Sequence, residues 1–197
     1  TGYVVSCRNY GAVNGRKEVG GIAGKLSGDY ASVSYCSVGS DVTVVATGED
    51  EAYVGGICGN FGQCLFGNSS TITVSNCAVL GKVSAPNATY QIGAVVGFYR
   101  QYSNAVEYIL VSNCFYIAGN TLRKGQVYDV GKGGYQVASD DGCNVLSSAS
   151  ASHSCVSVKH KEVTANCHQC GRSEYSFCLV CGKVTSGSKT ETPVNNN

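Results

Sequence analysis

Two Cys-x-x-Cys-Gly segments near the C-terminus are the residues of this chain best suited to chemistry. They read Cys167-His168-Gln169-Cys170-Gly171 and Cys178-Leu179-Val180-Cys181-Gly182, with seven residues between them. Each segment places two sulfurs on one tight turn, and the glycine that follows accepts a left-handed backbone. Four thiolates on two such turns have the geometry of a closed tetrahedral zinc site, which would be structural rather than catalytic. The predicted zinc ligands are Cys167, Cys170, Cys178 and Cys181.

Other ligands and other chemistries are open at this stage. The module resembles a zinc ribbon, but a gap of seven residues is short for that family, so Cys155 and His160 could replace one cysteine pair. Two disulfides would replace the metal on an oxidising cell surface. A redox-active Cys-x-x-Cys is disfavoured because no thioredoxin-like βαβ pattern surrounds either segment.

The rest of the chain is built from two short motifs that recur in fixed order. A Val-Ser-Cys type element is followed by a glycine-rich element of the form Val-Gly-Gly-Ile-x-Gly, and fixed order of this kind indicates a repeat protein. The first element ends at Cys7, Cys36, Cys77 and Cys114. The second covers residues 19–24, 54–59 and 92–97, with a degenerate fourth copy at 128–134.

These elements are short and rich in Val, Ile, Tyr and Thr, which is strand composition. No segment has the periodicity of a helix, and 26 glycines would destabilise one. Short strands that return every 29 to 41 residues between glycine turns predict an all-β fold, a parallel β-solenoid (β-helix) whose coils stack about 4.8 Å apart. The degenerate fourth copy is what a capping coil would look like.

Four cysteines occupy one position of the repeat, and we expect them to form a column of buried thiols. Equivalent residues of stacked coils lie about 4.8 Å apart, whereas the Cβ atoms of a disulfide lie about 3.8 Å apart, so the register disfavours bridging. A local disulfide between Cys58 and Cys64 is an open alternative. Cys143 has no evident partner in the sequence.

The repeat resembles the GLUG-motif repeats of bacterial surface proteins, over about residues 3–135. Val74-Ser75-Asn76-Cys77, the following Gly81 and Val83, and Val54-Gly55-Gly56-Ile57-Cys58-Gly59 carry this resemblance. Such repeats occur in adhesins and in non-catalytic regions of some IgA-cleaving metallopeptidases. The resemblance therefore implies an extracellular protein, on the cell surface or secreted.

Composition argues against several classes of function. The net charge is +1 and only 14% of residues are charged, so no nucleic-acid footprint is evident. No apolar run reaches the roughly 20 residues of a membrane span. All three histidines lie beyond residue 150, and His-Glu-x-x-His is absent, so we expect no enzyme.

Glu49-Asp50-Glu51 and Asp140-Asp141 read as solvated turns, with calcium binding as the alternative for the first. Arg100 between Tyr99 and Tyr102 is a weaker candidate for sugar stacking.

These observations predict four regions: repeats over 1–143, a Ser/Ala linker over 144–154, a cysteine-rich module over 155–184 and a flexible tail over 185–197. The expected function is that of a non-enzymatic adhesin or structural stalk, whose loops at 47–53, 63–71 and 99–107 would meet a host or matrix protein or glycan. One alternative is a self-assembling filament subunit, a homo-oligomer formed by end-to-end stacking of open solenoid ends. Another is an accessory region of a secreted hydrolase or peptidase. The lack of methionine and the Asn-rich end suggest a processed fragment of a longer protein.

Overall fold

The computed structural model describes residues 2–28, 30–49, 52–61, 72–87, 91–99, 109–134, 142–162, 171–188 and 190–192. The chain divides into two compact units, Thr1–His153 and Ser154–Asn197. All the regular secondary structure in the described ranges is β-strand, so the all-β class expected from the sequence is confirmed.

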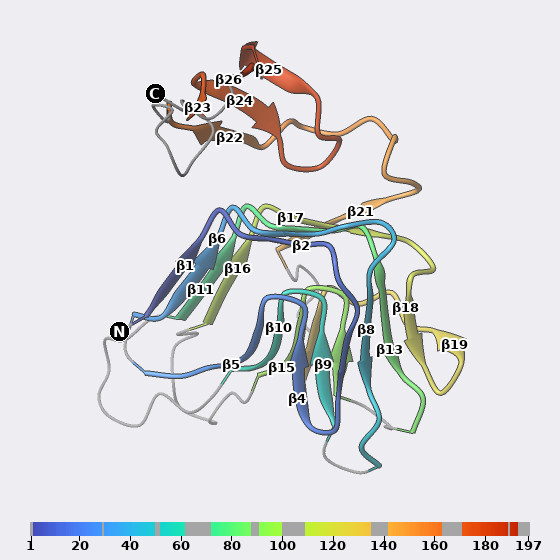
Figure 1. Ribbon diagram of the computed structural model, residues 1–197. Helices are drawn as coiled ribbons and strands as arrows, with labels where there is room; N and C mark the ends of the chain where they lie inside the picture. Colours follow the sequence, from blue (N-terminus) through green and yellow to red (C-terminus); the bar gives the residue numbers. More distant parts are fainter. Residues whose placement is uncertain are drawn as a thin grey trace. The chain divides into compact units, whose positions relative to one another are not determined.

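The first unit consists of parallel strands that return to the same sheet once per repeat (Figure 1). Five sheets result, and their strands run in sequence order from the N-terminus. The first sheet contains β1 (Tyr3–Val5), β6 (Ser32–Ser34), β11 (Ile72–Ser75) and β16 (Ile109–Ser112). The second contains β2 (Arg8–Asn9), β7 (Ser37–Val38), β12 (Ala78–Val79), β17 (Cys114–Ile117) and β21 (Cys143–Leu146).

The other three sheets follow the same order. The third contains β3 (Val13–Gly15), β8 (Thr43–Ala46), β13 (Lys82–Ala85), β18 (Thr121–Arg123) and β19 (Gln126–Val127), of which β19 pairs antiparallel with β18. The fourth contains β4 (Glu18–Gly20), β9 (Tyr53–Gly55) and β14 (Ile92–Gly93). The fifth contains β5 (Ala23–Leu26), β10 (Cys58–Phe61), β15 (Val96–Tyr99) and β20 (Lys132–Gly134). We call each passage through the sheets a coil; this arrangement is compatible with a β-solenoid.

The core of this unit is a set of aliphatic columns that run from coil to coil. In the first sheet Val4 pairs with Val33, Val33 with Val74, and Val74 with Val111. Val33 and Val74 are fully buried, and Val111 nearly so. Burial of one valine side chain contributes roughly 1.5–3 kcal/mol, so these columns are a main source of stability.

Left-handed residues form the corner between the first and second sheets. Each is the residue before the cysteine of its coil, and each has a φ angle between 48° and 73°. They are Ser6, Tyr35, Asn76, Asn113 and Gly142. The side chains of the two asparagines are also hydrogen-bonded to each other, with Asn113 Nδ2 donating to Asn76 Oδ1 at 2.8 Å.

The Gly-Gly motif is explained by close contact between backbones where the fourth sheet turns into the fifth. A Cβ atom on Gly55 would lie 2.2 Å from the carbonyl oxygen of Cys58 and 2.5 Å from the amide nitrogen of Gly97. A Cβ on Gly56 would lie 2.4 Å from the carbonyl oxygen of Ala94 in the next coil. Only glycine fits these positions without displacing backbone atoms. The degenerate fourth copy still supplies strand β20 at the corresponding place.

The second unit has two small antiparallel sheets. The first contains β22 (Ser157–His160), β24 (Tyr175–Cys178) and β25 (Val184–Gly187), and the second pairs β23 (Gly171–Arg172) with β26 (Glu191–Thr192). Strands β25 and β26 both extend into the range that the sequence assigns to a flexible tail.

Candidate functional site

The turn after β24 carries the second Cys-x-x-Cys-Gly segment. The amide of Gly182 donates to the carbonyl of Cys178 at 2.8 Å, and the amide of Cys178 donates to the carbonyl of Lys183 at 2.8 Å. Gly182 has a φ of 74°, so the left-handed glycine expected from the motif is present. The turn brings the Sγ atoms of Cys178 and Cys181 within 4.8 Å of each other, a separation at which one metal ion can bind both.

Cys155 joins this pair from the segment before β22. The amide of Leu179 donates to the carbonyl of Val156 at 2.8 Å, which fixes the Cys155 segment against the turn. The Cys155 and Cys178 thiols are hydrogen-bonded, and Cys181 is close enough to interact with Cys155. Desolvation and the neighbouring thiol raise the pKa of Cys155 to about 11. Although burial opposes it, hydrogen bonds from Cys181 and Cys155 lower the pKa of Cys178.

The thiols of Cys178 and Cys181 are suited to soft divalent metals, which bind thiolates. Of the predicted ligands in the described residues, Cys178 and Cys181 thus lie close enough together to hold one metal ion, and Cys155 lies next to Cys178. Cys167 and Cys170, the other two predicted zinc ligands, lie outside the described residues. The alternative ligand Cys155 is beside the turn, as the sequence allowed.

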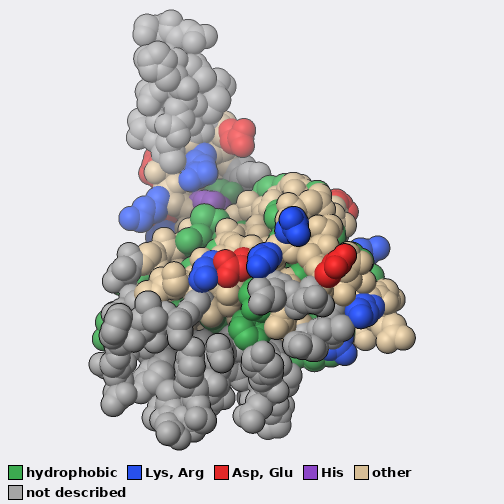
Figure 2. Space-filling model, turned by 90° about the horizontal axis from the view of Figure 1, so that it is seen from below, with side chains coloured by type: hydrophobic (Ala, Val, Ile, Leu, Met, Phe, Trp, Pro, Cys, Tyr) green, Lys and Arg blue, Asp and Glu red, His purple; other side chains and the backbone are tan. Residues whose placement is uncertain are grey.

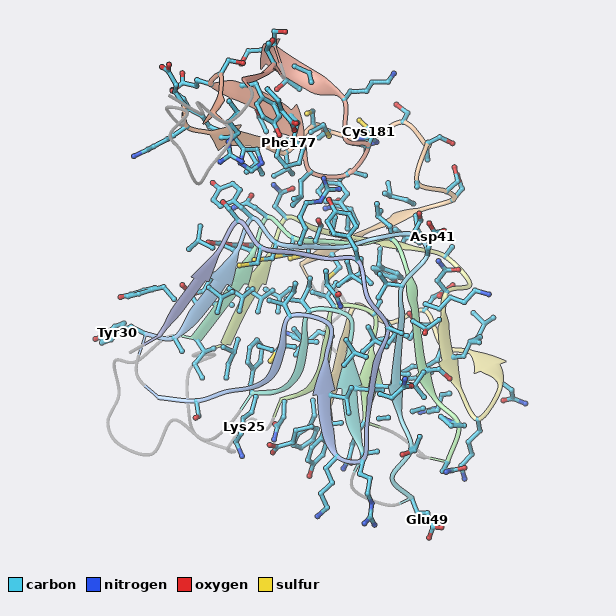
Figure 3. The ribbon with its side chains drawn as sticks, in the orientation of Figure 1. Lys25, Tyr30, Asp41, Glu49, Phe177 and Cys181 are labelled. Carbon is cyan, nitrogen blue, oxygen red and sulfur yellow. The ribbon has the colours of Figure 1, made fainter. Side chains whose placement is uncertain are left out.

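His160, the other alternative ligand, packs among aromatic rings on β24. Its ring stacks on Phe177 with a centroid distance of 5.1 Å and lies 5.0 Å from the ring of Tyr175. Figure 3 labels Phe177 on this strand and Cys181 at the turn beyond it. The position of His160 is therefore explained by ring packing as well as by any ligand role.

A second group of sulfurs lies in the first unit, where the expected column of thiols is present, but Cys7 is exposed and only the other three are buried as expected. Each of four thiols donates to the carbonyl of the residue two positions before it, at 3.2 to 3.5 Å. They are Cys7, Cys36, Cys77 and Cys114. Neighbouring thiols of the column are hydrogen-bonded, from Cys7 through Cys36 and Cys77 to Cys114. We call this column the thiol ladder.

Cys143 is a fifth member of the thiol ladder that sequence reasoning missed. It pairs in register with Cys114, where β21 extends the second sheet. The residue before it, Gly142, has the left-handed backbone of the other corners. The sequence signal that could have identified it is a glycine directly before a cysteine, because glycine accepts a left-handed backbone. The Val-Ser element that marks the other copies is missing here.

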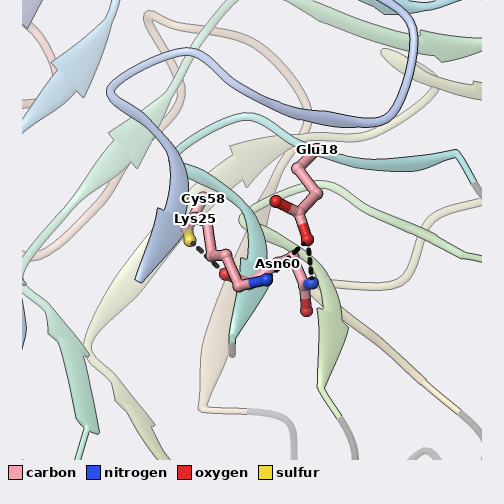
Figure 4. Close-up of polar contacts among 4 residues, drawn as sticks. All are labelled: Glu18, Lys25, Cys58 and Asn60. Atoms are coloured by element: carbon pink, nitrogen blue, oxygen red, sulfur yellow. Dashed lines mark hydrogen bonds and ion pairs between the residues drawn. The ribbon is translucent and has the colours of Figure 1, made fainter. Parts of the chain in front are cut away.

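A polar cluster links the fourth and fifth sheets (Figure 4). Glu18 Oε1 accepts hydrogen bonds from Lys25 Nζ at 3.0 Å and from Asn60 Nδ2 at 2.7 Å. Although burial opposes it, these bonds lower the pKa of Glu18. Nearby, Cys58 donates to the carbonyl of Asn60 at 3.3 Å, and burial raises the pKa of Cys58 to about 12. A thiol held protonated beside a bonded carboxylate indicates a structural cluster, not a nucleophile.

Other candidates from the sequence fall partly or wholly outside the described residues. Those outside are Cys64, Asp50, Glu51, Arg100, Tyr102 and Asp140-Asp141, together with most of the loops at 63–71 and 99–107. Cys58, which the alternative disulfide would join to Cys64, is a buried free thiol. In Figure 2, the basic and acidic side chains of the described part are interspersed on the face shown.

Comparison with known proteins gave no match to a family model, a curated protein or a solved structure. In the described part of the chain, no helix is long and apolar enough to cross a membrane.

Proposed function

We propose that the first unit is a β-solenoid that serves as a rigid, non-enzymatic scaffold of an extracellular surface protein, an adhesin or stalk. The observation that supports this proposal is the unbroken parallel register of the valine column through four coils. A stack of this kind resists bending because adjacent coils are hydrogen-bonded to each other. Its length changes little when loops vary, which suits the presentation of loops to a partner.

The topology also suggests where those loops would be displayed. The segments 62–71 and 100–108 each connect the fifth sheet of one coil to the first sheet of the next. The strands that flank the two segments occupy equivalent places in consecutive coils. A protein or glycan that contacts both segments would meet two loops of different sequence on one constant frame.

In the second unit we propose a structural zinc ion. Cys178 and Cys181 would supply two ligands, and Cys155, Cys167 and Cys170 are the cysteines from which the other two would come. A unit of about 44 residues buries too little surface to fold well alone, so a metal would contribute much of its stability. The thiol contacts of Cys155 support its inclusion.

An adhesion assay tests the proposed function. Beads coated with the protein would be passed over immobilised matrix proteins and glycans, and their retention under flow measured. Two variants replace residues 63–71 or 100–107 with Gly-Ser segments of equal length. A matched control replaces Lys124-Gly125, the exposed turn between β18 and β19, in the same way. Retention that falls with the loop variants but not with the control supports display; absent retention, or equal retention throughout, overturns it.

Self-association is a second candidate, because the first coil is open. Tyr3, Val5 and Tyr10 on this coil are 68%, 51% and 73% exposed. Strands β1 to β5 are edge strands, and unpaired edges of this kind bind other strands. Sedimentation velocity over a range of concentrations tests this: association that a Val5→Lys variant abolishes would support it, and a concentration-independent monomer would exclude it.

A further inference from the structure

The thiol ladder is not uniform along its length. Cys36, Cys77 and Cys114 are completely buried, whereas Cys7, on the first coil, is exposed. A small molecule in solvent can therefore reach the sulfur of Cys7 but not the sulfur of Cys36. The thiol of Cys7 is hydrogen-bonded to that of Cys36, and the amide of Cys7 also donates to Cys36 Sγ at 3.4 Å. The exposed thiol and its buried neighbour are thus already in contact.

The backbone allows these two cysteines to be bridged. They lie on adjacent parallel strands in register, since Arg8 pairs with Ser37 one residue further on. Adjacent strands lie about 4.8 Å apart, which is inside the Cα separation of about 4.4–6.8 Å found in disulfides. A bridge needs a small approach, because paired Cβ atoms must come to about 3.8 Å.

Position in the stack decides which pair can make this approach. The thiol of Cys77 is hydrogen-bonded to Cys36 on one side and Cys114 on the other, so a movement of Cys77 toward one of them opens a gap to the other. Cys7 belongs to the first coil, and its only ladder neighbour in the described residues is Cys36. Among the described residues the first coil pairs with a coil on one face, so a shift toward the second coil breaks none of these ladder contacts. The spacing between coils, which disfavours a disulfide inside the ladder, is therefore easiest to reduce at this end.

We propose that Cys7 and Cys36 form a redox modification site that takes small-molecule disulfides as its oxidising substrate. The thiolate of Cys7 attacks one sulfur of the small disulfide, forming a mixed disulfide and releasing one small thiolate. The thiolate of Cys36 then attacks the Cys7 sulfur, forming the Cys7–Cys36 disulfide and releasing the second small thiolate. Overall, two protein thiols are oxidised, one small disulfide is reduced to two thiols, and the two protein protons pass to the departing thiolates.

The titratable neighbours of Cys36 support this order of steps. The titratable groups that contact its sulfur are the thiols of Cys7 and Cys77, and the charged side chain of Arg8 binds the next residue, with Nε donating to Ser37 Oγ at 3.0 Å. The hydrogen bond from Cys77 lowers the pKa of Cys36 to about 7, although burial opposes it. Burial, with the neighbouring Cys36, raises the pKa of Cys7. The exposed thiol is thus the slower nucleophile, and the buried one is ready to complete the exchange.

The test uses the full reduced chain with oxidised glutathione as the probe. After a timed reaction and quenching with an alkylating reagent, digestion and mass spectrometry identify the partner of the peptide that contains Cys7. We expect a peptide linked from Cys7 to Cys36, and only traces of glutathione on Cys7. A Cys7 peptide that stays alkylated, or that links to another cysteine, overturns the proposal.

Two variants separate this pair from general thiol reactivity. In Cys36→Ala the second step is blocked, so glutathione should accumulate on Cys7 at least tenfold above its level in the parent chain. Cys114→Ala removes an interior ladder thiol that neighbours Cys77 and not Cys36, and the Cys7–Cys36 link should still form. Equal glutathione on Cys7 in the parent and in Cys36→Ala would refute the pairing. The linked peptide of the unmutated chain decides the question even where a variant folds poorly.

Discussion

Substitution of Gly55 by alanine tests whether the Gly-Gly motif exists to let neighbouring coils approach. The new Cβ would lie 2.2 Å from Cys58 O, 2.5 Å from Gly97 N and 2.8 Å from Val95 O. All three are backbone atoms, and Val95 O accepts hydrogen bonds from Ile57 and Cys58 across the coils. Relief of the clash means moving hydrogen-bonded backbone by an ångström or so, so we expect the free energy of unfolding to fall by about 3 kcal/mol or more.

Two other glycines provide matched controls for the same change. Gly119 has a φ of 78° and nothing within 4 Å of its added Cβ. Its substitution costs about 1–2 kcal/mol for the left-handed backbone, offset by about 0.4–1 kcal/mol from the lower entropy of the unfolded chain. Gly2 has neither a left-handed backbone nor a neighbour within 4 Å, so Gly2→Ala should change stability by less than about 0.5 kcal/mol.

Urea unfolding followed by far-ultraviolet circular dichroism measures all three variants against the parent chain. The order of loss should be Gly55→Ala, then Gly119→Ala, then Gly2→Ala. If Gly55→Ala unfolds at the same urea concentration as Gly119→Ala, the close backbone contact is not what requires glycine, and our explanation of the motif fails.

Tyr35→Asn should stabilise the chain by roughly 0.5–1 kcal/mol in the same urea assay, because asparagine tolerates the left-handed backbone and residue Tyr35 is 37% exposed; a loss of stability would show that ring contacts outweigh the backbone. Val74→Ala should cost about 2–3 kcal/mol because its side chain is fully buried, whereas the exposed Val5→Ala should cost under about 0.5 kcal/mol, and equal losses would contradict the core assignment. Cys178→Ser should reduce bound zinc, measured by elemental analysis, from about one per chain to well below one; a metal-free parent chain would refute the zinc proposal. The attack of Cys36 on a preformed mixed disulfide at Cys7 should slow about fiftyfold from pH 7 to pH 5. A pKa of about 7 leaves about half of the Cys36 thiol ionised at pH 7 and about 1% at pH 5. A rate that does not change with pH would contradict this pKa.

The repeat motifs predicted much of the first unit because each motif is a local requirement. Val-Gly-Gly-Ile-x-Gly marks a place where only glycine fits, and the short elements between glycine turns have strand composition, so the sequence predicted an all-β repeat. The left-handed corner was not predicted, because Ser6 and Tyr35 give no sign of it and only Asn76 and Asn113 are typical of it.

In the second unit the left-handed Gly182 and the short distance between Cys178 and Cys181 followed from the Cys-x-x-Cys-Gly pattern. The place of Cys155 did not follow, because it depends on a hydrogen bond between Leu179 and Val156 that has no local signature. Similarly, β26 pairs with β23 across about twenty residues, and nothing in its own composition indicates a strand. Long-range pairing of weak segments is what a single sequence leaves undetermined.

The exposed face of the first coil has an energetic consequence for the whole stack. Its inward residues occupy the same columns as those of the coils behind it, so one cross-section repeats along the axis. Each coil added to such a stack gains a complete interface with its neighbour, while the unfavourable exposure at the two ends stays constant. Stability per residue in this architecture therefore rises with the number of coils, and the terminal coils are the first to unfold.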